Sequence, residues 1–102
     1  MIIVLPTTPN TEEAEQLARK IVEGRLAACV QVLPPVKSFY FWEGALQADS
    51  EHLLLIKTLP EKYAALEEFI RSNHSYSVPE IVAVPAQRVS DDYFEWLKKY
   101  LD

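Results

Sequence analysis

Three short segments of this chain are apolar at every position, and they constrain the fold more than any other feature. They cover residues 2–5, 53–56 and 81–84. A strand with water on one face alternates apolar and polar residues, so an unbroken apolar run predicts a strand that is buried on both faces. We therefore expect a sheet that is covered on both sides.

Two amphipathic segments between these strands predict helices. Asn10 has the position of a cap for the first helix, with Glu13 as its reciprocal partner, and Gly24 marks the end. Thr58 and Glu61 have the spacing of a second capping box. In both segments apolar residues recur at the spacing of a helix with one buried face.

A long hairpin is expected between the two helices. Residues 27–42 are extended by pattern, with Pro34 and Pro35 in the middle, and Glu43–Gly44 marks a turn before a return strand over residues 52–58. Fully extended, residues 27–42 would span about 50 Å at ~3.3 Å per residue. A domain of this length has a diameter of only about 33 Å. The tip of the hairpin is therefore predicted to project, unless the segment curls back onto its own core.

A fourth strand over residues 80–86 and a last helix that starts after Ser90 complete the pattern. The order β-α-β-β-α-β-α predicts an α+β fold, in one domain over residues 1–102. It is a ferredoxin-like βαββαβ sandwich with a long kinked hairpin and an extra C-terminal helix. If the two prolines separate two strands, the fold is instead a five-stranded α+β variant.

Two features of this topology predict self-association. Right-handed crossovers place both connecting helices on one sheet face, and the last helix is too short to cover the other face, so another subunit is the natural cover. The hairpin tip carries four consecutive aromatic residues, Phe39, Tyr40, Phe41 and Trp42. Four exposed aromatic side chains favour aggregation unless a partner buries them. We expect the tip and the helix-free face to form a subunit interface.

Composition and motifs exclude several functional classes. The 10 Lys and Arg against 15 Asp and Glu argue against binding to a nucleic-acid backbone. Cys29 is the single cysteine, which excludes an intrachain disulfide and a multi-thiolate metal site. The first apolar run is too short for a signal peptide or a membrane span, so a cytoplasmic protein without membrane contact is expected. Catalytic triads, HExxH and glycine-rich phosphate loops do not occur, and we expect no enzymatic activity.

Five blocks of the sequence, in order, resemble the CutA family of divalent-cation tolerance proteins. They are residues 23–30 (EGRLAACV), 38–44 (SFYFWEG), 54–58 (LLIKT), 74–81 (HSYSVPEI) and 93–97 (YFEWL). The resemblance implies a ferredoxin-like subunit in a homotrimer, related in architecture to PII-type signalling proteins. It also implies a role in the response to metal ions, with copper binding in some members.

The copper ligands that the resemblance implies are a cysteine after the first strand and a pair of histidines before the fourth. Here these positions are Pro6 and Asn73–His74, so His74 is the one candidate metal ligand that remains. Copper selectivity normally requires several nitrogen or sulfur ligands. The sequence therefore predicts weak binding of copper or another divalent cation, and no dedicated cofactor.

The alternative function is a PII-like small-molecule sensor or a structural interaction module. Its ligand cleft would lie at a subunit interface near Lys57, His74, Tyr76 and Glu80. Lys57 and Glu80 are expected to lie near each other, either as a salt bridge or as part of that cleft. His74 could instead hold its own loop in place through a hydrogen bond, and His52 is expected to be exposed.

Overall fold

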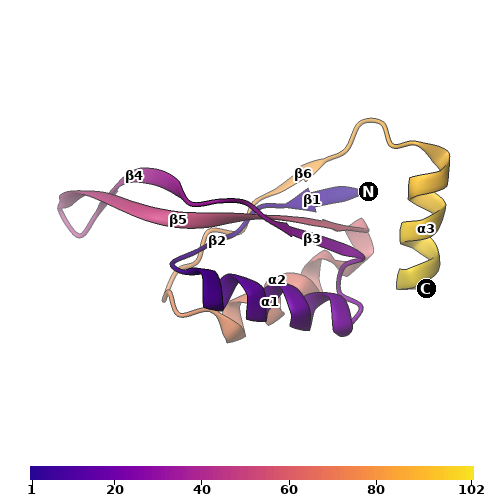
Figure 1. Ribbon diagram of the computed structural model, residues 1–102, viewed down its shortest axis with the longest axis horizontal. Helices are drawn as coiled ribbons and strands as arrows, with labels where there is room; N and C mark the ends of the chain where they lie inside the picture. Colours follow the sequence, from indigo (N-terminus) through magenta and orange to yellow (C-terminus); the bar gives the residue numbers. More distant parts are fainter.

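The computed structural model describes all 102 residues and shows an α+β fold with α1 and α2 on one side of an antiparallel sheet (Figure 1). The elements are β1 (Ile2–Val4), β2 (Thr7–Thr8), α1 (Thr11–Glu23), β3 (Cys29–Val32), β4 (Val36–Trp42), β5 (Ala45–Thr58), the 3₁₀ turn η1 (Pro60–Lys62), α2 (Tyr63–Asn73), β6 (Ala83–Pro85) and α3 (Asp91–Leu101). The molecule measures 45 × 25 × 23 Å, because the β4–β5 hairpin projects from the body as predicted (Figure 1).

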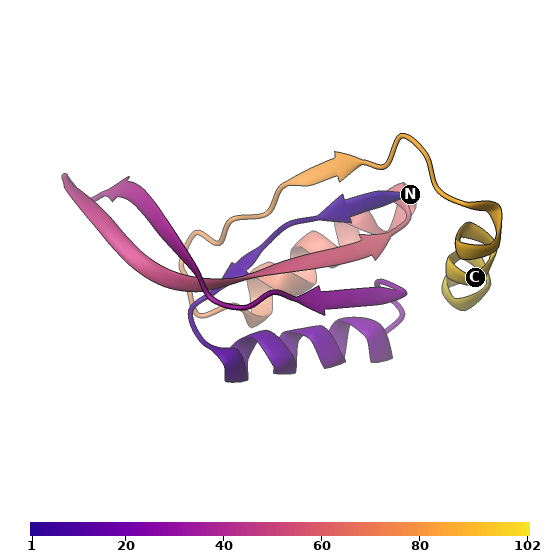
Figure 2. The same cartoon turned by 45° about the horizontal axis from the view of Figure 1, so that its top comes forward.

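The long strand β5 organises the sheet. Strands β1, β2, β3 and β4 all pair antiparallel with β5. Strands β1 and β3 share the stretch around Ile56 and Lys57 from opposite edges, and β6 pairs with the other edge of β1. Across the body of the molecule the order is β3-β5-β1-β6, which is the order of the predicted ferredoxin-like fold (Figure 2). The fold prediction is confirmed.

The sheet has six strands rather than four because prolines interrupt the ladder. Proline has no N–H to donate, so a strand breaks where one stands. Pro6 lies between β1 and β2, and Pro34–Pro35 lie between β3 and β4. Both parts of each interrupted strand pair with the continuous β5. Pro34 and Pro35 therefore kink one long strand and do not change the predicted strand order.

Two predicted strand boundaries were wrong. The return strand begins at Ala45 and not at residue 52, since β4 pairs with it from the turn onwards, starting at the Trp42–Ala45 pair. The last strand is shorter than residues 80–86, because only Ala83–Pro85 form a ladder with β1.

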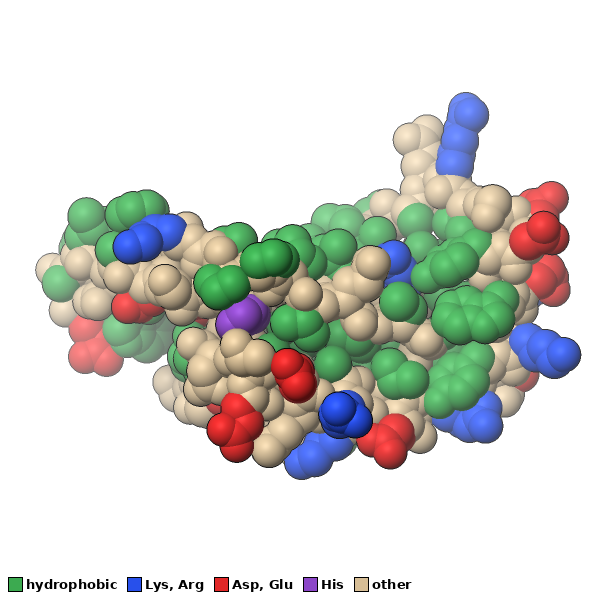
Figure 3. Space-filling model, in the orientation of Figure 1, with side chains coloured by type: hydrophobic (Ala, Val, Ile, Leu, Met, Phe, Trp, Pro, Cys, Tyr) green, Lys and Arg blue, Asp and Glu red, His purple; other side chains and the backbone are tan.

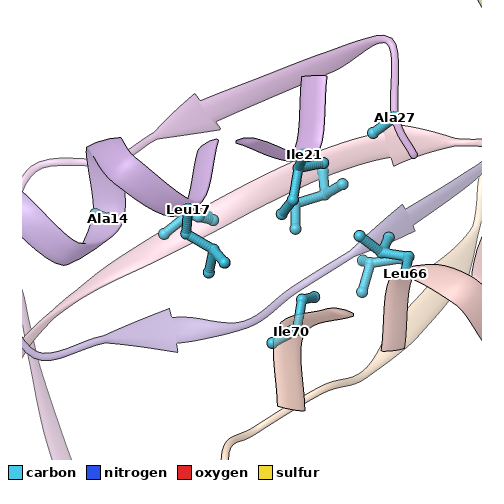
Figure 4. Packing of buried hydrophobic residues seen from close by; sticks show 9 residues of the cluster. Ala14, Leu17, Ile21, Ala27, Leu66 and Ile70 are labelled. Carbon is cyan, nitrogen blue, oxygen red and sulfur yellow. The ribbon is translucent and has the colours of Figure 1, made fainter. Parts of the chain in front are cut away.

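The main core lies between the sheet and the two helices α1 and α2 (Figure 4). Alternate residues of β5, Leu54 and Ile56, are fully buried against apolar side chains of both helices. The nine buried residues of the main core are Val4, Ala14, Leu17, Ile21, Ala27, Leu54, Ile56, Leu66 and Ile70. Full burial of one such Leu or Ile side chain stabilises the fold by about 1.5–3 kcal/mol.

The opposite face of the sheet is covered only in part. The strand register places Cys29, Lys57, Ile3 and Val84 in one row across this face. Helix α3 packs at one end, where its Leu97 contributes to a second, smaller core. Hydrophobic side chains gather over the sheet on the side away from α1 and α2 (Figure 3). The predicted second apolar face is therefore present, and much of it is uncovered in this chain.

The helix caps agree with the sequence only at α1. The Asn10 side chain accepts a hydrogen bond from the Glu13 backbone N–H at 2.8 Å. The carboxylate of Glu13 does not return to Asn10, because it accepts from the Ser75 backbone N–H at 3.2 Å. Ser90 is the residue before α3, but its side chain makes no capping hydrogen bond.

The predicted capping box of Thr58 and Glu61 was wrong. Thr58 is fully buried, and its hydroxyl donates to the Leu26 carbonyl at 2.7 Å, so it ties β5 to the segment before β3. Leu59 is the residue that precedes η1, which leads into α2. None of the three helices combines the length and the apolar character that crossing a bilayer requires.

Candidate functional site

A cleft of about 520 Å³ lies between the β4–β5 hairpin and the loop of residues 74–80. Its lining residues are Thr7, Ser38, Phe39, Tyr40, Trp42, Glu51, Tyr76, Ser77, Val78 and Glu80. The volume lies within the usual range of small-molecule sites, about 300–1,000 Å³. The lining combines aromatic side chains with two carboxylates and contains no lysine or arginine.

The hairpin register separates its aromatic residues onto two faces. Directly paired residues of an antiparallel ladder share a face, and successive residues alternate. Tyr40 and Trp42 therefore lie on the same face as Glu51, which is paired with Val36. Phe39 and Phe41 belong to the other face, although Phe39 also reaches the cleft.

The carboxylate of Glu51 is the buried polar group of the cleft. Glu51 is only 7% exposed, and its Oε2 accepts a hydrogen bond from the Tyr76 hydroxyl at 2.8 Å. Burial, together with this bond to a carboxylate, raises the pKa of Tyr76 well above its usual range. On the hairpin, the Tyr40 hydroxyl donates to Asp49 in the same way, and that bond raises the pKa of Tyr40.

His74 lies behind Tyr76, with the two ring centroids 4.7 Å apart. Its Nε2 is 2.7 Å from the Thr7 carbonyl, which can only accept, and its Nδ1 is 3.0 Å from the Tyr76 backbone N–H, which can only donate. These contacts make Nε2 the donor of the ring and Nδ1 the acceptor. The side chain is fully buried, and Glu13 Oε2 lies 3.4 Å from Nδ1.

Comparison with known proteins identifies the family. The family model of the CutA1 divalent ion tolerance protein matches residues 2–100. The chain belongs to this family. It is 48% identical over 97 residues to the chloroplastic protein CutA of Arabidopsis thaliana, and 42% identical over 97 residues to the divalent-cation tolerance protein CutA of Thermus thermophilus. These alignments cover 95% of this chain in both cases, 53% of the Arabidopsis protein and 94% of the Thermus protein.

Solved CutA structures have the same fold. The periplasmic divalent cation tolerance protein CutA of Archaeoglobus fulgidus superposes with a TM-score of 0.96 at 36% identity, and the alignment covers 100% of both chains. CutA1 of Oryza sativa superposes with a TM-score of 0.96 at 44% identity, over 99% of this chain and 93% of that one. The chain spans about half the length of its plant and animal relatives in sequence. A cytoplasmic location stays a prediction, since the names of relatives include chloroplastic and periplasmic proteins.

The residues at the copper-ligand positions that the family resemblance implied do not form a ready metal site in this chain. Pro6 is buried and has no side-chain donor, and the Asn73 amide donates to the Phe69 carbonyl at 2.8 Å. Both nitrogens of His74 are already in hydrogen bonds. No group of three or more His, Cys, Asp and Glu side chains has the arrangement of a metal site. The geometry therefore does not fit a dedicated copper centre.

Four residues were predicted to line a ligand cleft, and the folded chain brings only some of them together. Tyr76 and Glu80 line the cleft, and His74 packs directly behind Tyr76. Lys57 lies elsewhere, on the open face of the sheet, with its ammonium 5.8 Å from the centre of the Tyr93 ring. The Lys57 ammonium makes no salt bridge with Glu80.

His52, which was predicted to be exposed, and Cys29 both lie outside the cleft. His52 is half-buried and not exposed, because its Nδ1 bonds to the Leu33 carbonyl at 2.9 Å and its Nε2 to the Thr11 hydroxyl at 3.0 Å. Cys29 is half-buried near Tyr93 of α3, and burial together with the nearby thiol raises the pKa of Tyr93. Neither residue contributes to the cleft.

Sequence reasoning missed Glu51 and Thr7. Glu51 stands just before the apolar run of β5 and has no neighbour that marks it as a site residue. Thr7 contributes its carbonyl to His74, and a backbone group leaves no signature in the sequence. The one sequence signal that could have identified these two residues was their position, since each is a polar residue close to an apolar strand.

Proposed function

We propose that the protein is a non-enzymatic homotrimer that takes part in the response to divalent metal ions. Membership of the CutA1 family and the names of its relatives support the link to divalent cations. The number of subunits is the one that the resemblance to the family implies. The observation that carries the assembly is the apolar surface that a single subunit leaves uncovered.

The outer part of one hairpin face is apolar and exposed, and Lys37 and Ser50 lie at its inner end. Phe39, Phe41 and Leu46 are 68%, 72% and 72% exposed, and the register places Phe41 directly opposite Leu46. Contiguous exposed apolar patches mark protein contact sites. Tyr40 and Trp42, the other two aromatic residues of the predicted interface, turn to the face of the cleft. We assign the subunit contact mainly to the Phe39–Phe41 face.

The open face of the sheet supports the same proposal. Val82 and Val84 remain exposed beside β1, and α3 covers only the far end of this face. A second subunit seated on this surface would bury side chains that the isolated chain leaves in water. The hairpin and this face together provide two contact surfaces on each subunit.

Light scattering on a size-exclusion column tests the assembly. The expected mass is about three times the 11.7 kDa of one subunit. A monomer whose mass does not change with concentration would contradict the proposal.

Copper or another divalent cation binds weakly in this proposal, through His74. Ligation requires the ring to give up either its bond to the Thr7 carbonyl or its bond to the Tyr76 backbone N–H, and this loss opposes binding. Copper titration of the wild type, His74→Ala and the control His52→Ala should show weak binding that only His74→Ala removes. Nanomolar affinity that depends on His74 would contradict a weak site.

A small-molecule sensor is the second candidate, and the cleft favours it. Tyr76 and Glu80 line about 520 Å³ of space, with His74 behind them. Lys57 would have to reach such a site from a neighbouring subunit. A thermal-shift screen of metals and small metabolites separates the two candidates: stabilisation by a metabolite and not by divalent metals favours the sensor.

A further inference from the structure

We propose that the cleft between the hairpin and the loop of residues 74–80 binds an organic cation, a protonated amine or a quaternary ammonium group on an aromatic or aliphatic body. The proposal rests on the small-molecule candidate above and names its ligand class. It does not depend on copper.

The first argument for an organic cation is the negative charge of the cleft. Glu51 is buried, only its Oε2 has a hydrogen-bond partner, and that partner is the neutral hydroxyl of Tyr76. No lysine or arginine lines the cleft, and Lys37 of β4 belongs to the other face of the hairpin. A buried carboxylate without a cation is costly to maintain. Oε1 has no partner and is therefore not fully buried, since every fully buried side-chain oxygen has a hydrogen-bond partner. An ammonium group beside Oε1 would supply the missing charge, and a protonated amine would also donate a hydrogen bond to it.

The second argument is that the walls of the cleft are aromatic. Four aromatic residues line it: Phe39, Tyr40, Trp42 and Tyr76. Aromatic faces attract cations, and cages of several aromatic rings recognise organic ammonium groups. The volume of about 520 Å³ leaves room for an apolar body in addition to the charged group.

The same residues disfavour the other ligand classes. Glu80 adds a second carboxylate at the cleft and Asp49 lies close by on β5, so an anion such as a phosphate would meet only negative charge. A bare divalent ion prefers several oxygen ligands, and no cluster of three acidic side chains is present. An organic cation uses both the single buried carboxylate and the aromatic walls.

Calorimetric titration of the full chain with three matched probes tests the proposal. Phenethylamine is charged at pH 7.5, 2-phenylethanol is its neutral analogue and phenylacetate is its anionic analogue. Phenethylamine should bind about tenfold or more tightly than 2-phenylethanol, as expected for a charge-assisted hydrogen bond, and phenylacetate should not bind.

Variants locate the effect. Glu51→Gln keeps an oxygen for the Tyr76 hydroxyl and should weaken phenethylamine binding about tenfold or more, with 2-phenylethanol unaffected. Glu80→Gln, at an exposed position, should weaken it by a smaller factor and serves if Glu51→Gln does not fold. Glu23→Gln, at the far end of α1, is the control and should change nothing.

Three results would overturn the proposal: no binding of phenethylamine, equal affinity for the amine and the alcohol, or unchanged affinity in both cleft variants. Light scattering on the same preparations separates this outcome from the trimer. A trimer that does not bind the amine rejects the ligand alone, and a monomer that binds it rejects the assembly alone.

Discussion

The Tyr76 hydroxyl donates a hydrogen bond to the buried carboxylate of Glu51 at 2.8 Å, and this bond fastens the loop of residues 74–80 to the base of the β4–β5 hairpin. The two residues are 25 positions apart in the sequence. The contact closes one side of the cleft, so the stability of the loop and the shape of the cleft depend on the same pair.

Tyr76→Phe should lower the free energy of unfolding by about 1–3 kcal/mol, because it leaves the Glu51 carboxylate buried without a donor. Urea denaturation at a fixed subunit concentration measures the change. Tyr63→Phe is the control, since it removes a similar hydroxyl–carboxylate bond to Glu67, which is more exposed. An equal loss in both variants would show that the burial of Glu51 has no energetic consequence.

The same tyrosine should make stability sensitive to alkaline pH. The pKa of Tyr76 is raised in the folded state, so the folded protein keeps this proton at a pH where the unfolded chain has lost it. The stabilisation is complete below the unfolded pKa of about 10 and is lost as the pH rises through the folded pKa. Urea denaturation at about pH 8, 10 and 11 should therefore show a smaller alkaline loss in Tyr76→Phe than in the wild type. Parallel curves would contradict this assignment.

His74→Ala should lower the free energy of unfolding by about 2–4 kcal/mol without any metal present. The change removes the bonds to the Thr7 carbonyl and to the Tyr76 backbone N–H, and each buried group left without a partner costs about 1–3 kcal/mol. Denaturation in the presence of a chelator measures it. Gln16→Ala, at an exposed position of α1, should stay within about 0.5 kcal/mol of the wild type. A similarly small effect at His74 would mean that the ring does not hold the loop.

Phe41→Ser should shift the protein towards smaller species. In an isolated subunit Phe41 is 72% exposed and contributes little, whereas truncating one of the few hot-spot residues of an interface costs about 2 kcal/mol or more of association free energy. Light scattering over a dilution series measures the mass. Trp96→Ser, which removes another exposed aromatic residue on α3, is the control and should leave the mass unchanged. If Phe41→Ser assembles like the wild type, this face of the hairpin is not the contact.

Glu43→Asn should stabilise the hairpin by about 0.5–1 kcal/mol. Glu43 and Gly44 both have positive φ, at 50° and 79°, which is the geometry of a type I′ turn that favours Asn-Gly. Gly44→Ala should be destabilising although no atom lies within 4 Å of the added Cβ, because the cost comes from the backbone angle alone. Melting temperatures of the two variants should therefore move in opposite directions, and a shift in the same direction would contradict the turn assignment.

The sequence determined the features whose signals are local. Asn10 identified the start of α1 because a cap and the N–H group that it accepts from are three residues apart. The apolar run in β5 identified a strand with two apolar faces, and the structure buries Leu54 on one face while Leu55 lies on the other. Such patterns show whether a segment is a helix or a strand and where it ends. This information was enough to predict the order of elements in the ferredoxin-like fold.

Only the tertiary structure decided the candidate site. His74 bonds to a carbonyl 67 positions away, Tyr76 to a carboxylate 25 positions away, and Thr58 leaves its predicted cap for a carbonyl 32 positions away. Each of these polar groups could bond to several partners. The partner that it has in the structure is the one that the packed elements bring within about 3 Å. Burial then raises the cost of leaving such a group unpaired, so the choice of partner belongs to the folded molecule and not to the local sequence.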